Sequence, residues 1–279
     1  FSGMRESVVL ATKTLKRTAA EADKHLERSL RRLKTDYIDL YQLHQIAQED
    51  DWNAVTAPNG ALETLVRAKK EGKIRWIGVT SHNLAMAVRL VKTDLFSTIQ
   101  FPFNFIEDAA KDELHAAAFE RGMGILAMKP FAGGMINNAA VAFMFLRQHH
   151  GVIPIPGFDS IDAVNEVVSL YEHPNRVTEK DLRLMEAYRT ELGRQFCRRC
   201  EYCNPCPSGV MITQAMGYQV IAGRMSPAVA VEFSRAAMES VKLCTLCGTC
   251  EERCPYELPI QDMLKRHYDL YERHRTELR

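Results

Sequence analysis

Cysteine is absent from the first 196 residues of this 279-residue chain, so all eight thiols belong to one region near its end. The chain also lacks a charge excess, because 36 Lys and Arg residues face 35 Asp and Glu residues. Without a basic surplus, the composition does not favour nucleic acid or an anionic membrane as a partner. The longest apolar runs, such as Ala139 to Leu146, are far shorter than a membrane span. Since no signal-peptide pattern opens the sequence, we expect a soluble cytoplasmic protein.

What the sequence does contain is a regular alternation from residue 7 to about 170. Short apolar, β-branched segments, which favour strands, alternate with amphipathic stretches, which favour helices. Together they predict six βα units and a parallel sheet. The expected strands cover residues 7–12, 37–44, 73–80, 98–103, 124–128 and 152–157. The first expected helix opens with a Thr18 to Glu21 capping box, and a later one ends at Gly72.

A closed barrel of alternating strands and helices needs eight βα units, and only six are counted here. The pattern therefore predicts an α/β fold over residues 1–175, a TIM-type (β/α)8 barrel that lacks its first two βα units. A first residue of Phe1 rather than Met agrees with an N-terminal truncation. An open, doubly wound sheet is the structural alternative. It is disfavoured because no GxGxxG turn follows the first expected strand.

Four polar residues stand at the ends of expected strands, namely Lys13, His44, Thr80 and Ser81. Active sites of such barrels lie at the carboxyl ends of the strands, so these residues are candidates for chemistry. By strand alternation His44 shares a face with Gln42, which directs it toward the barrel mouth. The alternative for a lone Lys or His at a strand end is a solvated or hydrogen-bonded residue without a chemical role.

The segments "VVLATKT", "SLRRLKTDYIDLYQLH", "IRWIGVTSHN", "IQFPFNF" and "ILAMKPFAGG", in this order, resemble the aldo-keto reductases from residue 5 to about 170. In that family a Tyr exchanges a proton with the substrate carbonyl, a Lys lowers the Tyr pKa, a His orients the carbonyl and an Asp holds the Lys. The resemblance assigns the Lys to Lys13 and the His to His44. The family's Tyr and Asp belong to the two absent units, so no residue of this chain takes those roles.

The resemblance also implies NAD or NADP, bound without a Rossmann domain by strand ends and loops. The residues to which it points are Thr80, Ser81, Gln100, Met128, Lys129, Gly133, Gly157 and Glu166. Met128 departs from the family, which usually stacks a Tyr on the nicotinamide, but the polarizable Met side chain can pack there. No Arg or Lys stands at the expected position for the 2′-phosphate near Gly157, so a preference for NADP lacks support.

The cysteines form two runs with ligand spacing. The second run has the bacterial ferredoxin pattern C-x2-C-x2-C-x3-C-P and consists of Cys244, Cys247, Cys250 and Cys254. The first run has one residue fewer before its last Cys and consists of Cys197, Cys200, Cys203 and Cys206. A helix is expected over the connecting residues 176–196, and helical sequence also separates the two runs. Residues 197–279 are therefore expected to form a small, mainly helical, ferredoxin-like iron-sulfur domain.

Three thiols spaced by two residues can surround three corners of a cubane, and the Cys before Pro ligates the other cluster in two-cluster ferredoxins. The spacing therefore predicts two 4Fe-4S clusters. One would be held by Cys197, Cys200, Cys203 and Cys254, and the other by Cys206, Cys244, Cys247 and Cys250. Two structural zinc sites are the alternative, although these usually use separated CxxC pairs. Disulfides are disfavoured in a long chain without an export signal.

The two regions together resemble iron-sulfur-containing aldo-keto reductases. The resemblance implies an oxidoreductase that reduces a small carbonyl substrate, or oxidises an alcohol, with NAD(P). The clusters raise the further hypothesis of a redox partner protein. Because a hydride carries two electrons and each cluster carries one, direct coupling between them is not expected. The alternative, motivated by the missing Tyr and Asp, is an electron-transfer or docking protein with a non-catalytic barrel.

Overall fold

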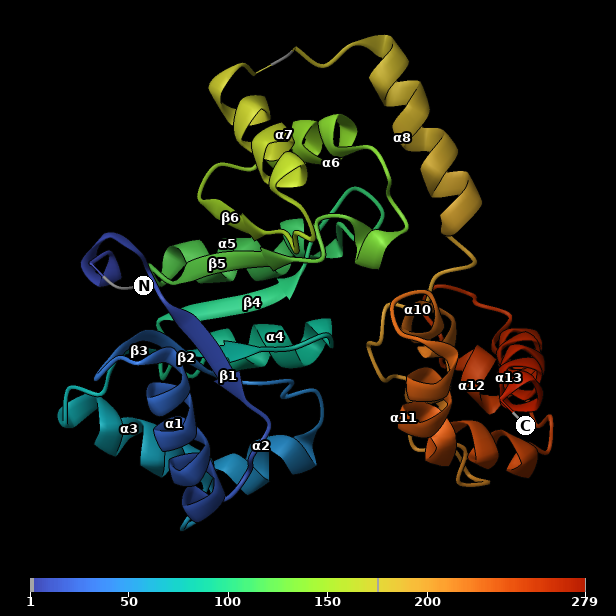
Figure 1. Cartoon of the computed structure of the whole chain (residues 1–279), viewed down its shortest axis with the longest axis horizontal. Coiled ribbons are helices and arrows are strands. Elements are labelled where there is room, and N and C mark those ends of the chain that lie inside the picture. The colour runs from blue at the N-terminus through green and yellow to red at the C-terminus, as the bar shows by residue number, and fades with distance from the viewer. Residues whose placement is uncertain (1–2, 175, 279) are drawn as a thin grey trace. The chain divides into compact units, whose positions relative to one another are not determined.

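Six apolar, β-branched segments of the chain become the six strands of one sheet (Figure 1). The computed structural model describes residues 3–174 and 176–278. The strands are β1 Ala11–Thr14, β2 Ile38–Leu43, β3 Ile74–Thr80, β4 Thr98–Pro102, β5 Gly124–Met128 and β6 Val152–Ile155. The predictions for β2 to β6 are confirmed to within two residues at each end. β2 is buried along its whole length, as expected for a strand covered on both faces.

The strands pair in their sequence order, from β1 to β6, and every pair is parallel. β1 and β6 are the two edges of this described sheet. A doubly wound sheet reverses its strand order at a switch point, and the order here contains no reversal. The doubly wound alternative is therefore wrong. A sequential parallel order with crossover helices is that of the TIM-type α/β fold.

β1 starts at Ala11, four residues later than the expected strand over 7–12. Residues Arg5–Ser7 form a short 3-10 helix instead, and Val9 is 76% exposed. The reason lies in Asp39 on β2, whose carboxylate accepts a hydrogen bond from the Leu10 backbone N–H at 2.9 Å. Since that N–H is already used, the ladder with β2 begins only at Ala11.

Helices connect the strands and complete a first compact unit over residues 1–176. They are α1 Ala19–Leu33, α2 Glu49–Thr56, α3 Ala61–Lys70, α4 Leu84–Val91, α5 Glu113–Glu120, α6 Ala139–Leu146 and α7 Ile161–Glu172, with 3-10 turns Arg5–Ser7, Ala109–Lys111 and Ala132–Gly134. Thr18 caps α1 as expected, because its side chain accepts the Glu21 N–H at 3.4 Å. Gly72, with a φ of 76°, follows α3 at the predicted place. α2 was not expected, and it begins with a capping box between Gln48 and Asp51.

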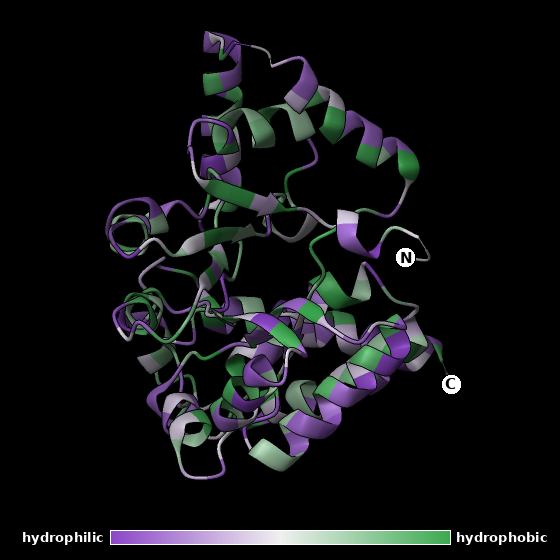
Figure 2. Ribbon diagram, turned by 90° about the vertical axis from the view of Figure 1, so that its left-hand side faces the viewer, coloured by the Kyte–Doolittle hydropathy of each residue, from purple (hydrophilic) through white to green (hydrophobic). Residues whose placement is uncertain are grey.

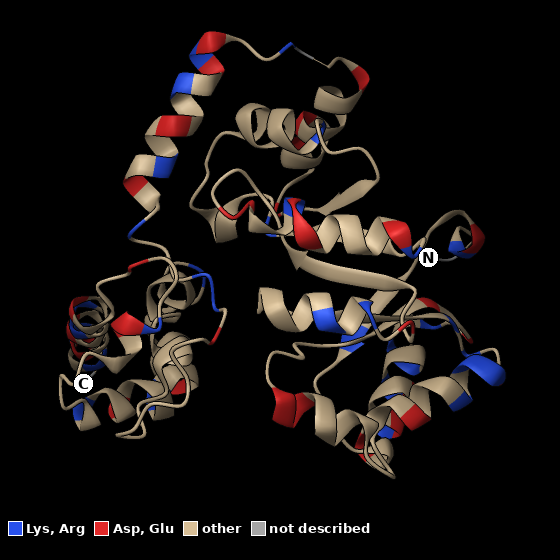
Figure 3. Ribbon diagram, turned by 180° about the vertical axis from the view of Figure 1, so that it is seen from behind, with Lys and Arg blue, Asp and Glu red and all other residues tan. Residues whose placement is uncertain are grey.

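Residues 177–279 form a second compact unit built from helices. These are α8 Glu179–Leu192, α9 Ile212–Ala215, α10 Tyr218–Ala222, α11 Pro227–Ser240, α12 Thr249–Glu252 and α13 Ile260–Glu277, with a 3-10 turn Val241–Leu243. Thr178 and Asp181 form a capping box at the start of α8. Acidic and basic residues alternate along α8 (Figure 3). α8 lies within the expected connecting segment 176–196 and belongs to the same unit as the cysteines.

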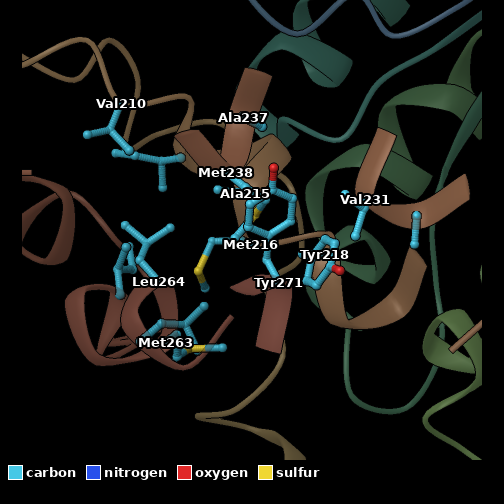
Figure 4. Packing of buried hydrophobic residues seen from close by; sticks show 14 residues of the cluster. Val210, Ala215, Met216, Tyr218, Val231, Ala237, Met238, Met263, Leu264 and Tyr271 are labelled. Atoms are coloured by element: carbon cyan, nitrogen blue, oxygen red, sulfur yellow. The ribbon is translucent and has the colours of Figure 1, made fainter. Parts of the chain in front are cut away.

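The core of the second unit is formed by apolar side chains from α9, α10, α11 and α13 (Figure 4). The rings of Tyr218 and Tyr271 meet edge to face, with centroids 5.5 Å apart, and Met238 is fully buried beside them in the same core. α13, which ends at the C-terminus, carries both hydrophobic and hydrophilic residues (Figure 2) and buries Met263 and Leu264 in this core. Within residues 3–174 and 176–278, every helix is too short or too polar to cross a bilayer.

The buried carboxylate of Asp39 stabilises the N-terminal end of the sheet. Its oxygens lie 2.8 Å from Arg5 and 2.8 Å from Arg75, and both guanidinium groups lie over the Tyr37 ring. Burial raises the Asp39 pKa, but the hydrogen bond from Leu10 and the nearby Arg5 outweigh burial, so the pKa is lowered overall. The ionised carboxylate therefore stabilises the fold above the ordinary Asp pKa of about 3.9. That stabilisation is lost as the pH falls through the lowered pKa.

We expect Asp39→Asn to lower the free energy of unfolding of the first unit by about 3 kcal/mol, because it removes a buried carboxylate that pairs with the half-buried Arg5 and accepts the Leu10 N–H. Both tryptophans, Trp52 and Trp76, lie in this unit, so their fluorescence during urea unfolding reports on it alone. Asp23→Asn is the control, since it removes only an exposed ion pair with Arg67. The control should cost less than about 1 kcal/mol. Equal losses for the two variants would contradict the assignment.

Candidate functional site

The strand register gathers the predicted barrel residues on one face of the sheet. Lys13 pairs with Gln42, which pairs with Gly78. Thr80 lies two residues beyond Gly78 and pairs with Gln100. Residues paired across parallel strands point to the same side, and side chains alternate along each strand. We call the resulting surface at the carboxyl ends of the strands the polar rim, and it consists of Lys13, Gln42, His44, Thr80, Gln100 and Met128.

Lys13 and His44 lie at the neighbouring ends of β1 and β2. The His44 N–H donates to the Thr14 carbonyl at 2.9 Å, and Arg17 donates to the His44 carbonyl at 2.9 Å. Burial lowers the pKa of Lys13. Burial, followed by the positive charges of Lys13 and Arg17, lowers the pKa of His44 to about 4. His44 is therefore a neutral imidazole at pH 7, which can donate a hydrogen bond without carrying a charge.

Thr80 and Ser81 are fully buried, and their hydroxyl groups bind the backbone. The Gln45 N–H donates to Thr80 Oγ1 at 2.8 Å, which joins the loop after β2 to the end of β3. Ser81 Oγ donates to the Asn83 carbonyl at 3.2 Å and accepts the Asn83 N–H at 3.1 Å. The Thr80 hydroxyl retains its proton for another acceptor, whereas the Ser81 proton is already used. Of the predicted carboxamide-binding pair, Thr80 is therefore the better donor.

Gln100 and Met128 contact each other on the polar rim. Gln100 Nε2 lies 3.4 Å from the Met128 sulfur, and both side chains are buried. Lys129 follows with a φ of 57°, and its carbonyl accepts a hydrogen bond from Asn104 Nδ2 at 3.0 Å. Gly133, in the loop before α6, has a φ of 73°, a value that favours glycine. The buried Asn104, which was not expected from the sequence, thus fixes the backbone beside the rim.

Gly157 and Glu166 lie outside the polar rim. Gly157 follows β6 at the same end of the sheet and is exposed. Glu166 is exposed on the helix α7. The nucleotide role of these two residues stays a prediction.

Gln42 is a candidate site residue that the strand-end rule did not select. It is 1% exposed, and its Nε2 has no hydrogen-bond partner among the described residues. Gly78 allows close packing beside it, since an added Cβ would lie 2.3 Å from Thr98 Oγ1 and 3.0 Å from Gln42 Cγ. A buried amide without a partner is costly unless water or a ligand satisfies it. Its position two residues before His44 is the sequence signal that could have identified it.

In the second unit, the cysteines line two cavities. The first cysteine site is lined by Cys197, Cys200, Cys203 and Cys254. The second cysteine site is lined by Cys206, Cys244, Cys247 and Cys250, and Cys203 reaches this cavity too. The last cysteine of each run therefore lies with the first three of the other run. This crossing is the arrangement that two-cluster ferredoxin spacing requires.

The geometry of the thiols distinguishes between the alternatives for this region. All eight thiols are free, which contradicts the disulfide alternative. A tetrahedral zinc ion would gather its thiolates about 2.3 Å from one point. In residues 3–174 and 176–278, no three His, Cys, Asp or Glu side chains are gathered in a way that could hold a single metal ion. Four thiols spread around each cavity therefore fit a cubane, whose corners lie apart, better than a single ion.

The two sites differ in the environment of their thiols. Burial raises the pKa of Cys200 to about 11 and that of Cys203 to about 12. Cys247 is exposed, and hydrogen bonding with the Thr249 hydroxyl, 3.5 Å from the sulfur, lowers its pKa. Because iron binds thiolates, cluster binding at the first cysteine site must displace protons from buried thiols.

Comparison with known proteins agrees with this division of the chain. Residues 1–142 match the aldo/keto reductase family, and residues 196–259 match the 4Fe-4S dicluster domain. The uncharacterized oxidoreductase YrpG of Bacillus subtilis is 34% identical over 160 residues, which are 49% of this chain and 46% of that protein. The aldo-keto reductase YhdN of Bacillus subtilis is 30% identical over 188 residues, 60% of this chain and 54% of that protein. The chain thus spans about half the length of the curated relatives it matches.

Two solved structures share the fold of the first unit. The holo form of aldo-keto reductase AKR11C1 from Bacillus halodurans superposes with a TM-score of 0.54 at 23% identity, covering 67% of this chain and 73% of that one. An aldo-keto reductase from Klebsiella pneumoniae in complex with NADPH gives a TM-score of 0.52 at 22% identity, covering 67% and 72%. At these identities the likeness shows the fold alone, and it supports the TIM-type assignment from the strand order.

The lowered pKa of His44 can be measured directly by NMR. We expect its imidazole to titrate near pH 4, and Lys13→Met to raise that pKa, because one of the positive charges that disfavour protonation is removed. His115, whose pKa burial lowers to about 4, should not change and serves as an internal reference. The control variant is Lys69→Met on α3. A His44 pKa that is unchanged in Lys13→Met would show that the two side chains do not interact.

Proposed function

Because the chain belongs to the aldo/keto reductase family and carries a 4Fe-4S domain, we propose that it reduces a carbonyl or oxidises an alcohol with NAD or NADP. The observation that best supports this proposal is the polar rim. There Lys13, a neutral His44, Thr80 and Gln100 share one face of the sheet. The NADPH complex of the Klebsiella pneumoniae protein, which has a similar fold, supports a nicotinamide nucleotide as the cofactor.

Within this proposal each rim residue has a definite task. His44 donates a hydrogen bond to the substrate oxygen, and Lys13 supplies positive charge beside it. The Thr80 hydroxyl, the Gln100 amide and the unpartnered Gln42 amide offer hydrogen bonds to the nicotinamide carboxamide. When bound, the nicotinamide supplies or takes up the hydride. The family's proton-transferring Tyr has no match here, so that proton is assigned to no residue of this chain.

We further propose that the chain is organised as a partial barrel over 1–175, a connecting helix over 176–196 and an iron-sulfur domain over 197–279. The crossing of the two cysteine runs supports two 4Fe-4S clusters, one in each cysteine site. A one-electron redox partner would be needed for the clusters to take part in turnover, because the nicotinamide transfers electrons in pairs. An electron-transfer protein with a non-catalytic barrel is the second candidate function, favoured by Met128 at the nicotinamide position.

Nucleotide binding separates these two functions. We expect the chain to bind NADPH and NADH, detected by nucleotide fluorescence, without strong preference, because the sequence after Gly157 has no Arg or Lys at the positions expected for the 2′-phosphate. Gln100→Leu should weaken nucleotide binding about tenfold, because it removes one hydrogen bond worth about 1.4 kcal/mol. Gln214→Leu, at an exposed glutamine of the second unit, is the matched control. Absence of binding by the parent chain would favour the non-catalytic barrel, and equal affinities of the two variants would refute the assigned site.

Cluster content tests the cysteine assignment. Protein purified without oxygen should contain about eight iron and eight sulfide per chain. Cys254→Ser should remove the cluster of the first cysteine site and Cys206→Ser that of the second, each leaving about four iron, with different EPR signals for the clusters that remain. Ser208→Ala, which lines the second site without a thiol, should retain both. Two zinc ions and no iron, or both clusters kept in the Cys→Ser variants, would overturn the assignment.

A further inference from the structure

The two cysteine sites differ in their access to solvent. Cys247 in the second site is the one exposed cysteine of the eight, whereas Cys200 in the first site is only 9% exposed. Two clusters of the same type would therefore differ in how easily a molecule from solution can reach them. This difference concerns how electrons reach the clusters, and it rests on the proposed function that both sites hold clusters.

The residues that line the two cavities strengthen the difference. The second cysteine site has no charged lining residue, and besides its cysteines it is lined by Pro207, Ser208, Val210, Ile212, Thr245, Gly248, Gln261 and Leu264. The first site is lined by Arg198, Arg199 and Glu201. The guanidinium of Arg198 is buried over the ring of Tyr256, 3.9 Å from its centroid, and both residues line that cavity. Arg198 and Tyr256 therefore cover part of the first site.

Two exposed leucines lie beside Cys247. Leu243 is 54% exposed and Leu246 is 69% exposed, and they flank Cys244 and Cys247 in the sequence. Leu246 has a φ of 56°, which is uncommon for a bulky residue and is a form of local strain that concentrates at functional positions. Exposed apolar surface next to a redox centre is easily desolvated when a second molecule approaches. The loop thus places a predicted cluster ligand at the surface, beside two exposed leucines.

The two sites are also adjacent to each other. Cys203 and Ile212 line both cavities, so a single cysteine and a single aliphatic side chain lie between them. An electron that reaches the second site therefore has a short path to the first site through the protein interior. The first site has no comparable exposed ligand of its own, because its four cysteines are half-buried or buried.

From these observations we propose that electrons enter and leave the protein at the second cysteine site, through the surface formed by Leu243, Leu246 and Cys247. The first site then exchanges electrons with the exterior by way of the second. In each exchange a one-electron carrier is oxidised by one electron and the second site is reduced by one, or the reverse. No proton is transferred, and no covalent bond is formed or broken. A partner is therefore a one-electron carrier that can approach an apolar surface.

Charge placed beside the entry surface tests this inference. Dithionite is an anionic reductant, so Leu246→Lys should accelerate cluster reduction about threefold and Leu246→Glu should slow it similarly, with both effects fading at high salt. The rate is followed by stopped-flow loss of visible absorbance in the intact chain. Leu243→Lys and Leu243→Glu repeat the test at the second leucine, in case a Leu246 variant loses its clusters.

Two matched controls complete the design. Leu278→Lys and Leu278→Glu carry the same changes at an exposed leucine about 26 Å along α13 from Gln261, which lines the second site. Glu257→Lys adds positive charge near Cys254 of the first site, where Glu257 is exposed and paired with Arg194. Neither control should change the rate.

Equal rates for the leucine variants and the Leu278 controls, or a larger effect of Glu257→Lys, would overturn the inference while leaving the two clusters in place. Iron and sulfide are measured for every variant. A parent protein without iron would instead contradict the proposed function, and the inference would fail with it.

Discussion

Parallel strand pairing decides which side chains of the first unit can meet. Residues from β1 to β5 that are far apart in the sequence lie together because every strand enters the sheet at the same end. At the start of β1, Asp39 ends the ladder, because its carboxylate accepts the Leu10 N–H and pairs with Arg5 and Arg75. A slip of β1 by one residue would turn Lys13 to the opposite face of the sheet, away from His44. The polar rim thus depends on the register of β1 against β2.

In the first unit the sheet register decides which side chains meet. In the second unit the crossing of the two cysteine runs decides which thiols meet. Short helices and loops cannot by themselves fix thiols at the corners of two cavities, because loop backbone is held by few regular hydrogen bonds. The apolar core around Tyr218 and Met238 supports both runs from one side, with most of the cysteines packed against it. Packing therefore positions the runs, and each completed site would join the beginning of the unit to its end.

The sequence predicted the features that depend on residue spacing and on strand alternation. It failed to predict those that depend on a side chain hydrogen-bonding to the backbone. The strand-end rule selected Lys13 and His44, and the cysteine intervals indicated which thiols line the same cavity. The late start of β1 could not be foreseen, because it follows from a hydrogen bond between residues 29 positions apart. The hydrogen bonds between the Ser81 hydroxyl and the Asn83 backbone likewise depend on the turn that follows β3. Exposure of Cys247 follows from the loop conformation at Leu246, which no pattern of apolar residues encodes.

The 37 residues between Cys206 and Cys244 include α9, α10 and α11, which supply much of the apolar core. Because both of these cysteines line the second site, a cluster there would close this segment into a ring. Closing a ring restricts the unfolded chain and so favours the folded one. The stability of the second unit would then depend on its loading with iron, because a chain without metal lacks this closure.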